Sequence, residues 1–312
     1  MSFDSTIKEI ESQQTDIPDY VRFLDSLIWK KTRTEDAIFV GAGDSLACAT
    51  FVERLTSFSA RSFDPGDLLQ NSEIASGKDV YFISVSGKTK ANIEAAKLVK
   101  GISKRSVAVT ANSESELAKN CTEVLPLRFS KNQGLTPGTN SFTASLVACS
   151  RIFCISPNGN NLDEVIDDAR KWGTNHSRIR GMVHFVSGGC IHAIAMYGAA
   201  KVFEFSGQKA DYQLTEEFSH MNLFSMSNDD SVIILKGREN DMASEKLNEE
   251  LVNEGFDSEI LDYNRSGLLD RALALSIHFQ YLALGMAMVK GLKQPAFLSN
   301  DRILGISNRM IY

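Results

Sequence analysis

The feature that most constrains this chain is a strand–turn–helix pattern that occurs twice. The stretch "AIFVGAGDSLACATFVERL", from Ala37, has a partner in "MVHFVSGGCIHAIAMYGAAKVFEF", from Met182. Each consists of a short apolar run, a turn of small residues and a long amphipathic segment. A second pair, residues 78–112 and 229–264, follows in the same order. Alternating strands and helices joined by short turns predict parallel sheets with helices on both faces, here in two copies.

The two copies also predict the domain organisation. The segment "SPNGNN", with Pro157, a glycine and closely spaced asparagines, interrupts the pattern and leads into a short helical connector. We expect a helical lead over residues 1–29, a first domain over 30–156, a connector over 157–178, a second domain over 179–285 and a tail over 286–312.

Composition and charge exclude several classes of protein. The chain has 312 residues, 43% of them hydrophobic, so it is long enough to bury two cores. We find no apolar run near the roughly 20 residues of a membrane helix, and the acidic, polar start does not resemble a signal peptide. A net charge of −6 and the lack of a basic cluster give no attraction for nucleic acid. We therefore expect a cytoplasmic protein with neither a membrane nor a nucleic-acid partner.

The five cysteines predict no covalent framework. They are odd in number and contain no C-x-x-C pair, which argues against both disulfides and a zinc site. We expect them to be reduced packing residues, and no histidine–carboxylate cluster indicates another metal. The cysteines are Cys48, Cys121, Cys149, Cys154 and Cys190.

The string "FISVSGKT", from Phe82, resembles the end of an ATP-binding loop but fails the test for one. The Walker pattern requires a glycine five places before Gly87, and that place holds Phe82 within an apolar strand. What remains is a strand followed at once by three hydroxyls and a glycine, and then by a helix. The first turn of a helix has unpaired N–H donors and the positive end of the dipole, so a phosphate fits there. The alternative is that one of the hydroxyls is an ordinary helix cap.

Four motifs in order resemble the sugar isomerase (SIS) domain family, and most closely the isomerase half of glutamine:fructose-6-phosphate amidotransferase. They are "GAGDS", "SVSGKT", "TPGTNSFT" and "AKVFEFSGQKADYQLTEEFSH", which together span most of the chain. The resemblance implies two tandem SIS domains, each a flavodoxin-like, three-layer α/β/α sandwich with a parallel sheet. Because the second copy lacks the hydroxyls, one phosphate site is expected per chain.

The resemblance also implies roles for individual residues. Phosphate binding falls on Ser45, Ser84, Ser86 and Thr89, with a backbone contact from Val85. Sugar contacts fall on Asp44, Thr136, Gly138, Thr139, Glu217 and Asn300. The catalytic segment places Lys201 with Glu204 as the base, and His220 as the group that opens the sugar ring, which relatives donate from a neighbouring subunit.

The catalytic assignments have plainer alternatives. Lys201 and Glu204 are three residues apart on a helix, so they could form a surface salt bridge worth a few tenths of a kcal/mol. Against this, Phe203 and Phe205 flank Glu204, and an apolar setting raises a carboxyl pKa toward the range of a general base. His220 could be a surface histidine. Its offset from Glu204 favours a role in the site.

The chain departs from the amidotransferase at three places, one of which is "HMN" from His220, where the amidotransferase has "HGP". Ser2 stands where the glutaminase domain has its cysteine nucleophile, and Asn300 stands where the lysine that forms a Schiff base is expected. We therefore expect no glutamine-dependent amination. The favoured function is an aldose–ketose isomerase acting on a hexose 6-phosphate or amino-hexose 6-phosphate, with no cofactor, since the carbonyl itself acidifies the neighbouring C–H bond.

Two alternatives stay open: a glucosamine-6-phosphate deaminase or fructosamine-phosphate deglycase, and a sugar-phosphate sensor without catalysis. A homodimer with shared active sites is also expected, because apolar helical segments such as residues 273–289 need to be covered.

Overall fold

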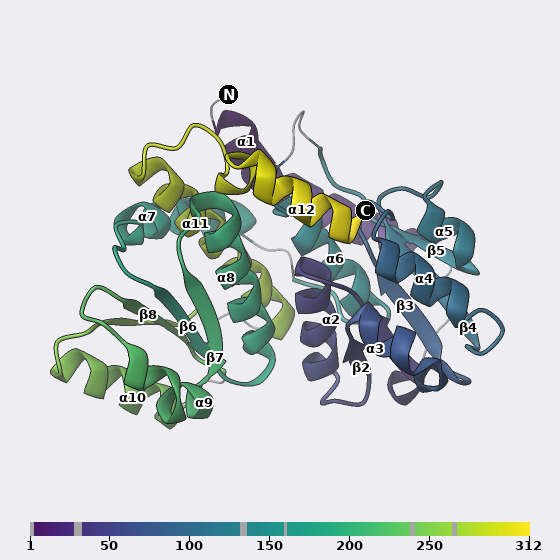
Figure 1. The fold of residues 1–312 in the computed structure, drawn as a ribbon, viewed down its shortest axis with the longest axis horizontal. Helices are drawn as coiled ribbons and strands as arrows, with labels where there is room; N and C mark the ends of the chain where they lie inside the picture. The colour runs from purple at the N-terminus through teal and green to yellow at the C-terminus, as the bar shows by residue number, and fades with distance from the viewer. Residues whose placement is uncertain (1–2, 28–32, 132–135, 159–160, 238–240, 264–266) are drawn as a thin grey trace. The chain divides into compact units, whose positions relative to one another are not determined.

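The computed structural model describes residues 3–27, 33–131, 136–158, 161–237, 241–263 and 267–312 (Figure 1). The chain divides into two compact units. The first unit comprises Ser12–Lys131, Asn140–Gly159 and Asp301–Tyr312. The second comprises Met1–Glu11, Asn132–Thr139 and Asn160–Asn300. Helix α1 (Asp4–Ser26) therefore contributes its first turns to the second unit and the rest to the first. The predicted boundary at residues 29–30 lies outside the described residues.

The first unit contains a five-stranded parallel sheet in the order β2-β1-β3-β4-β5. Its strands are β1 (Ala37–Val40), β2 (Arg61–Phe63), β3 (Asp79–Ile83), β4 (Arg105–Thr110) and β5 (Glu123–Pro126). Its helices besides α1 are α2 (Asp44–Leu55), α3 (Pro65–Gln70), α4 (Lys90–Leu98), α5 (Glu116–Asn120), α6 (Asn140–Arg151) and α12 (Asp301–Ile311).

Both faces of this sheet are covered, which explains why β1, β3 and β4 are buried at every residue. Alternate residues of the strands point to opposite faces. Val80 and Phe82 pack with α3, α4 and α5 on one face. Phe39 and Tyr81 stack at 4.9 Å on the other face, where Phe153 follows α6. The result is a three-layer arrangement of helices, sheet and helices.

The second unit contains a four-stranded parallel sheet in the order β7-β6-β8-β9. Its strands are β6 (Val183–Ser187), β7 (Ala210–Leu214), β8 (Ser231–Leu235) and β9 (Asp257–Leu261). Its helices are α7 (Leu162–His176), α8 (His192–Ser206), α9 (Thr215–His220), α10 (Met242–Asn253) and α11 (Leu268–Val289). Phe218 and Leu251 bring α9 and α10 onto one face. Phe279 of α11 packs on Phe185 at the other face.

Helix α11 corrects two expectations. By length and composition it could cross a membrane, with a mean hydropathy of 1.6, although no such run was expected. However, 83% of that window is buried inside the protein, as is typical of a helix at the centre of a domain. Its apolar face is covered by α7 and α8 of the same chain. The prediction that a partner subunit must cover the apolar residues 273–289 is therefore wrong.

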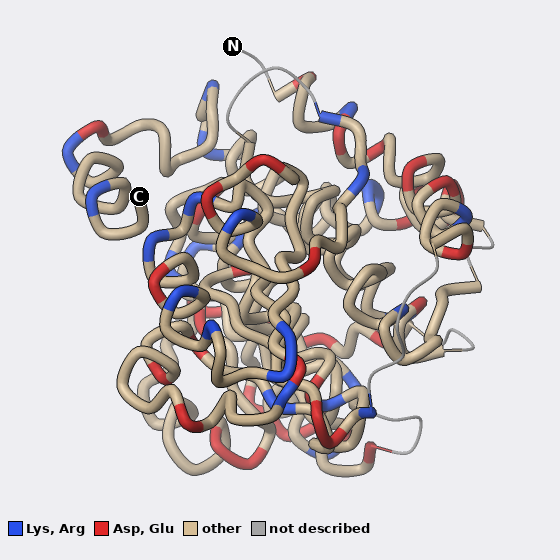
Figure 2. Tube along the Cα trace, turned by 90° about the vertical axis from the view of Figure 1, so that its right-hand side faces the viewer, with Lys and Arg blue, Asp and Glu red and all other residues tan. Residues whose placement is uncertain are grey.

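The predicted fold class is confirmed: two parallel sheets, each flanked by helices, follow one another along the chain. The strand–helix pairs lie where the repeated pattern predicts them, because burial on both faces of a sheet selects continuous apolar runs. Figure 2 shows acidic and basic residues interspersed along the trace of the described chain.

Candidate functional site

Two predicted phosphate segments meet at the carboxyl ends of β1 and β3. These strands are hydrogen-bonded neighbours, with Val40 opposite Phe82, so the loops that follow them start side by side. Strand β1 lies between β2 and β3 in the sheet. The chain passes from β1 to β2 on one side of it and then to β3 on the other side, so the strand order reverses at β1. This reversal is the position at which open α/β sheets bind ligands. A Cβ on Gly41 would lie 2.7 Å from the backbone of Ser45, so only glycine lets the first loop fold onto α2.

The second loop, residues 84–89, holds its hydroxyls around the start of α4. Ser84 is buried, and its hydroxyl lies 3.1 Å from that of Thr89. Thr89 is the N-cap residue of α4, yet within the described chain its hydroxyl forms no capping bond. Ser86 is half-buried, and its hydroxyl accepts a hydrogen bond of 3.2 Å from the backbone N–H of Lys88. Because Thr89 turns toward Ser84 and not onto its own helix, the loop differs from an ordinary cap.

Sequence reasoning missed the residues that hold this loop. Asn92, on α4, is buried and donates a 2.9 Å hydrogen bond to the carbonyl of Ile83. Thr110, at the end of β4, donates to the carbonyl of Val85 at 3.1 Å. Val85 was predicted to contact the phosphate through its backbone. In the structure its backbone carbonyl accepts the bond from Thr110 and so supports the loop. A buried polar residue inside an apolar helical pattern, as at Asn92, was the only sequence signal.

The remaining predicted residues of the first unit lie at the start of α2. Ser45 and Asp44 occupy its first turn and are both half-buried. The structure thus gathers Ser45, Asp44 and the residue 84–89 loop at the same edge of one sheet, near the amino ends of two helices. Backbone N–H groups and hydroxyls at such ends suit an anion.

In the second unit, Lys201 and Glu204 form an ion pair on α8. The Lys201 side chain is completely buried, whereas 35% of the Glu204 side chain is exposed. The ammonium also lies 5.0 Å from the centre of the Tyr197 ring, one helical turn earlier. An adjacent ammonium stabilises an ionised carboxylate, which is the form that accepts a proton. The flanking phenylalanines differ: Phe205 is buried and Phe203 is half exposed.

The predicted sugar loop, residues 136–139, belongs to the same unit and is held from two sides. Tyr197 donates a 2.7 Å hydrogen bond to the carbonyl of Gly138. The hydroxyls of Thr136 and Thr139 donate to the carboxylate of Glu9, on α1, at 2.9 and 2.5 Å. Thr139 has no exposed surface, so its side chain faces the protein interior. No motif or spacing in the sequence relates Glu9 to this loop.

The other predicted residues are exposed. Glu217 and His220 lie on the six-residue helix α9, which is anchored by the buried Phe218. Asn300 is exposed at the end of the second unit. The structure joins Lys201, Glu204 and the sugar loop through Tyr197, whereas Glu217 and His220 lie on a separate helix, α9.

Two buried histidines outside the predicted site have hydrogen-bond partners. His184 is buried on β6, with its Nδ1 2.9 Å from the carboxylate of Asp211. His278 is buried on α11, with its Nδ1 2.8 Å from the carbonyl of Ala274. The partners are distant in sequence or part of the backbone, so spacing did not reveal them.

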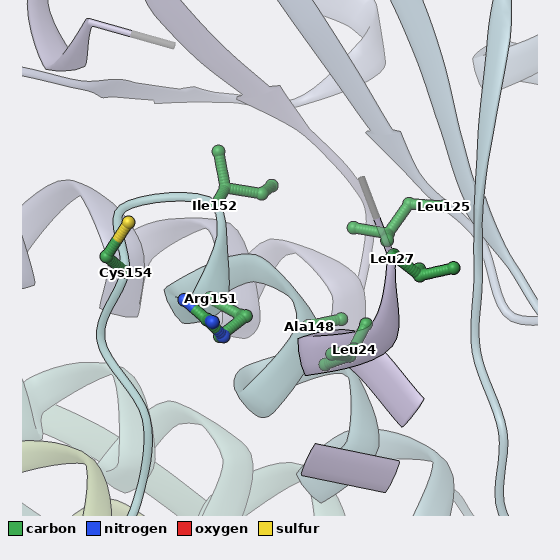
Figure 3. Close-up of a pocket in the computed structure, with 7 residues that line it drawn as sticks. All are labelled: Leu24, Leu27, Leu125, Ala148, Arg151, Ile152 and Cys154. Atoms are coloured by element: carbon green, nitrogen blue, oxygen red, sulfur yellow. The ribbon is translucent and has the colours of Figure 1, made fainter. Parts of the chain in front are cut away.

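A separate cavity of about 200 Å³ opens in the first unit beside the last turn of α6 (Figure 3). None of its lining residues belongs to the loops that follow β1 or β3. Its wall combines apolar side chains with Arg151, which is paired to Asp25 at 2.6 Å. The lining residues are Leu24, Leu27, Leu125, Ala148, Arg151, Ile152 and Cys154. Among the residues that the structure describes, no group of three or more His, Cys, Asp or Glu side chains could hold a metal.

Comparison with known proteins gives the same family as the motifs. Residues 32–154 match the SIS domain family. Among curated proteins, no sequence matches the chain significantly.

Solved structures match over nearly the whole chain. Glucosamine-6-phosphate deaminase from Thermotoga maritima has a TM-score of 0.74 at 19% identity, over 94% of this chain and 98% of that one. Tagatose-6-phosphate ketose/aldose isomerase from Escherichia coli has a TM-score of 0.69 at 15% identity, over 92% of each chain. The C-terminal domain of glucosamine-fructose-6-phosphate aminotransferase from Francisella tularensis has a TM-score of 0.69 at 18% identity, over 92% and 97%. Residues 32–154 are therefore an SIS domain, within a chain that has the fold of these sugar-phosphate proteins.

Proposed function

We propose that the chain is a sugar-phosphate aldose–ketose isomerase acting on a hexose 6-phosphate or an amino-hexose 6-phosphate. The observation that carries the proposal is the Lys201–Glu204 pair, in which a fully buried ammonium lies beside a carboxylate that remains partly exposed. In a surface salt bridge both partners stay in water. Burial of an ammonium carries a desolvation cost, which a surface salt bridge does not have. The buried Lys201 therefore favours a functional role for the pair. The SIS domain and the fold of the Escherichia coli isomerase add support.

In this proposal the 84–89 loop holds the phosphate. Ser84, Ser86 and Thr89 supply hydroxyl donors, and the first turn of α4 supplies backbone N–H groups. With a net charge of −6 the whole chain repels an anion, so these short-range donors provide the attraction.

The reaction itself is a pair of proton transfers. His220 gives a proton to the ring oxygen while the anomeric hydroxyl loses one to solvent, which opens the sugar. Glu204 then takes the proton from C2 as O1 gains a proton from solvent, which gives the enediol, and returns it to C1 as the O2 hydroxyl loses its proton to solvent. The Lys201 ammonium stabilises the Glu204 carboxylate that accepts the C2 proton. His220 is exposed on its own chain, in keeping with the role that we assign to it in a neighbouring subunit of a homodimer.

A deaminase or deglycase is the second candidate, favoured by the likeness to the Thermotoga maritima deaminase. The same base can act on an amino sugar: transfer of the proton from C2 to C1 gives an imine at C2, and water then adds to C2 and replaces ammonia, which leaves the ketose. Asn300 stands where the resemblance places the lysine of the amidotransferase, so glutamine-dependent amination is not expected. Product analysis with fructose 6-phosphate and glucosamine 6-phosphate, each with and without added ammonia, separates the two candidates.

Glu204→Gln tests the proposal. Glutamine keeps the size of the side chain but accepts no proton, so turnover should fall about 10²–10⁴-fold with little change in binding. The measurement is exchange of the C2 proton of glucose 6-phosphate with deuterium from solvent, which detects the base even when no net product forms. Glu249→Gln, at an exposed position on α10, is the matched control.

Equal exchange by the wild type and Glu204→Gln would assign the base to another group, with Glu217 tested next. Binding of the sugar phosphate without exchange by either protein would instead support a sensor without catalysis.

A further inference from the structure

The sugar loop, residues 136–139, is bound by two buried side chains that no sequence motif identifies. Glu9 has 5% of its surface exposed and accepts hydrogen bonds from Thr136 and Thr139. Tyr197 is fully buried and donates to the carbonyl of Gly138. All of these residues belong to the second unit.

The hydrogen-bonding geometry determines what this loop can offer to a ligand. A threonine hydroxyl has one proton to donate, and both threonines donate theirs to Glu9. Thr139 is also fully buried, so its hydroxyl is out of reach of a bound molecule. Gly138, in contrast, is partly exposed. The loop therefore presents backbone groups to a sugar, while its hydroxyls anchor it.

Tyr197 connects this loop to the helix that carries the proposed base. Its phenol oxygen accepts a 3.0 Å hydrogen bond from the buried amide of Gln280 while donating to Gly138. Its ring lies 5.0 Å from the Lys201 ammonium. The position of the loop is thus fixed relative to Lys201 and Glu204 by one side chain.

We propose that Glu9 and Tyr197 are positioning residues for sugar binding, and that the Thr139 hydroxyl acts through Glu9 and not on the substrate. The inference rests on the proposed function. A buried carboxylate is a costly way to anchor a loop, since apolar packing of similar volume is often as stable. Its use here fits a loop whose backbone must be held in one orientation.

The first test uses Glu9→Gln and Tyr197→Phe. Phenylalanine keeps the ring beside Lys201 and removes the hydroxyl that donates to Gly138 and accepts from Gln280, and it serves as the second variant if Glu9→Gln does not fold. We expect KM, or Kd measured by calorimetry with fructose 6-phosphate, to rise roughly tenfold in each variant, while kcat changes less than about threefold. Glu11→Gln, on the same helix and paired with Arg170 at 2.7 Å, is the matched control and should leave both constants unchanged. Thermal unfolding checks that each variant is folded.

The second test is a double-mutant cycle of Glu9→Gln with Thr139→Val. If Thr139 acts through Glu9, the double variant should have the KM of the worse single variant. Multiplication of the two effects would mean that Thr139 contacts the sugar independently, which overturns the inference. Unchanged KM and Kd in both Glu9→Gln and Tyr197→Phe would overturn it too, while leaving an active wild type as an isomerase. A wild type that neither binds nor converts fructose 6-phosphate or glucosamine 6-phosphate would instead refute the proposed function, and the inference with it.

Discussion

At the scale of single residues, Gly87 shows how closely the 84–89 loop is built. Its φ of +65° lies in the left-handed region, and a Cβ there would lie 2.1 Å from the Ser115 hydroxyl. Both the backbone conformation and the available space therefore require glycine. The loop packs against Ser115 and Thr110, so its hydroxyl-bearing residues are held in place by neighbours that do not themselves face a ligand.

A second prediction for single residues concerns the loss of the phosphate-binding hydroxyls of Ser86 and Thr89. Ser86→Ala combined with Thr89→Ala should remove two hydrogen bonds to a charged group, each worth about 1.5–3 kcal/mol. Calorimetry with fructose 6-phosphate should then show affinity reduced by at least about a hundredfold. Ser113→Ala, at an exposed position after β4, is the control. Unchanged affinity in the double variant would exclude this loop as the phosphate site.

The cysteines give a prediction about pH. Burial raises the pKa of the Cys121 thiol to about 12, and burial also raises that of Cys48, which is fully enclosed. The thiolate is the reactive form, so neither should be alkylated by iodoacetamide between pH 7 and 9 in the folded protein. Cys154 is exposed and should be labelled first. Mass spectrometry of peptides after timed labelling measures this, and rapid labelling of Cys48 would show that the α2–α6 packing opens.

At the scale of elements, the second unit depends on close contact between α7 and α11. A Cβ on Gly173 would lie 2.7 Å from the backbone carbon of Tyr281, and one on Gly285 would lie 2.9 Å from the Cβ of Ser177. Each helix thus has a glycine where the other approaches it. Since these clashes involve backbone and short side chains, rotamer changes do not relieve them.

Gly173→Ala should consequently destabilise the protein although alanine favours helices. The added methyl forces the two helices apart, with an expected loss of about 1–3 kcal/mol in the free energy of unfolding. Urea denaturation followed by circular dichroism measures the loss. Lys171→Ala, at an exposed position on the same helix, should change stability by less than about 0.5 kcal/mol. A neutral or stabilising Gly173→Ala would contradict the contact between the helices.

At the scale of the whole molecule, the compact units do not follow the order of the chain. The second unit includes residues from the start of α1 and the 136–139 loop as well as residues 160–300. With α11 buried in its own unit, the case for a homodimer no longer rests on an uncovered helix. It rests on His220, which is exposed and which we assign to the site of a neighbouring subunit.

Subunit complementation tests this assignment. Glu204→Gln and His220→Asn should each be nearly inactive alone. If each site takes its base from one chain and its histidine from the other, random mixing makes half of the dimers hybrid, each with one intact site. Activity should then recover to about a quarter of the wild-type value. No recovery after verified subunit exchange, or a fully active monomer in sedimentation, would refute shared sites.

The sequence by itself determined the class of the fold and the local parts of the site. Burial on two faces imposes continuous apolar runs on parallel strands, and helical periodicity marks the segments between them, so both can be recognised without distant contacts. The hydroxyls of the 84–89 loop and the pairing of Lys201 with Glu204 are local as well, because residues three apart on a helix are neighbours.

Only the tertiary structure decided what surrounds these parts. Glu9 lies 127 residues from Thr136 in sequence, and Tyr197 lies 59 residues from Gly138, so no spacing rule relates them. Helix α11 is a second example. Its long apolar sequence was compatible with an interface to a partner subunit, but in the structure α7 and α8 of the same chain cover it. Contacts of this kind depend on how whole elements pack together, and a local pattern carries no information about which distant segment will supply the partner.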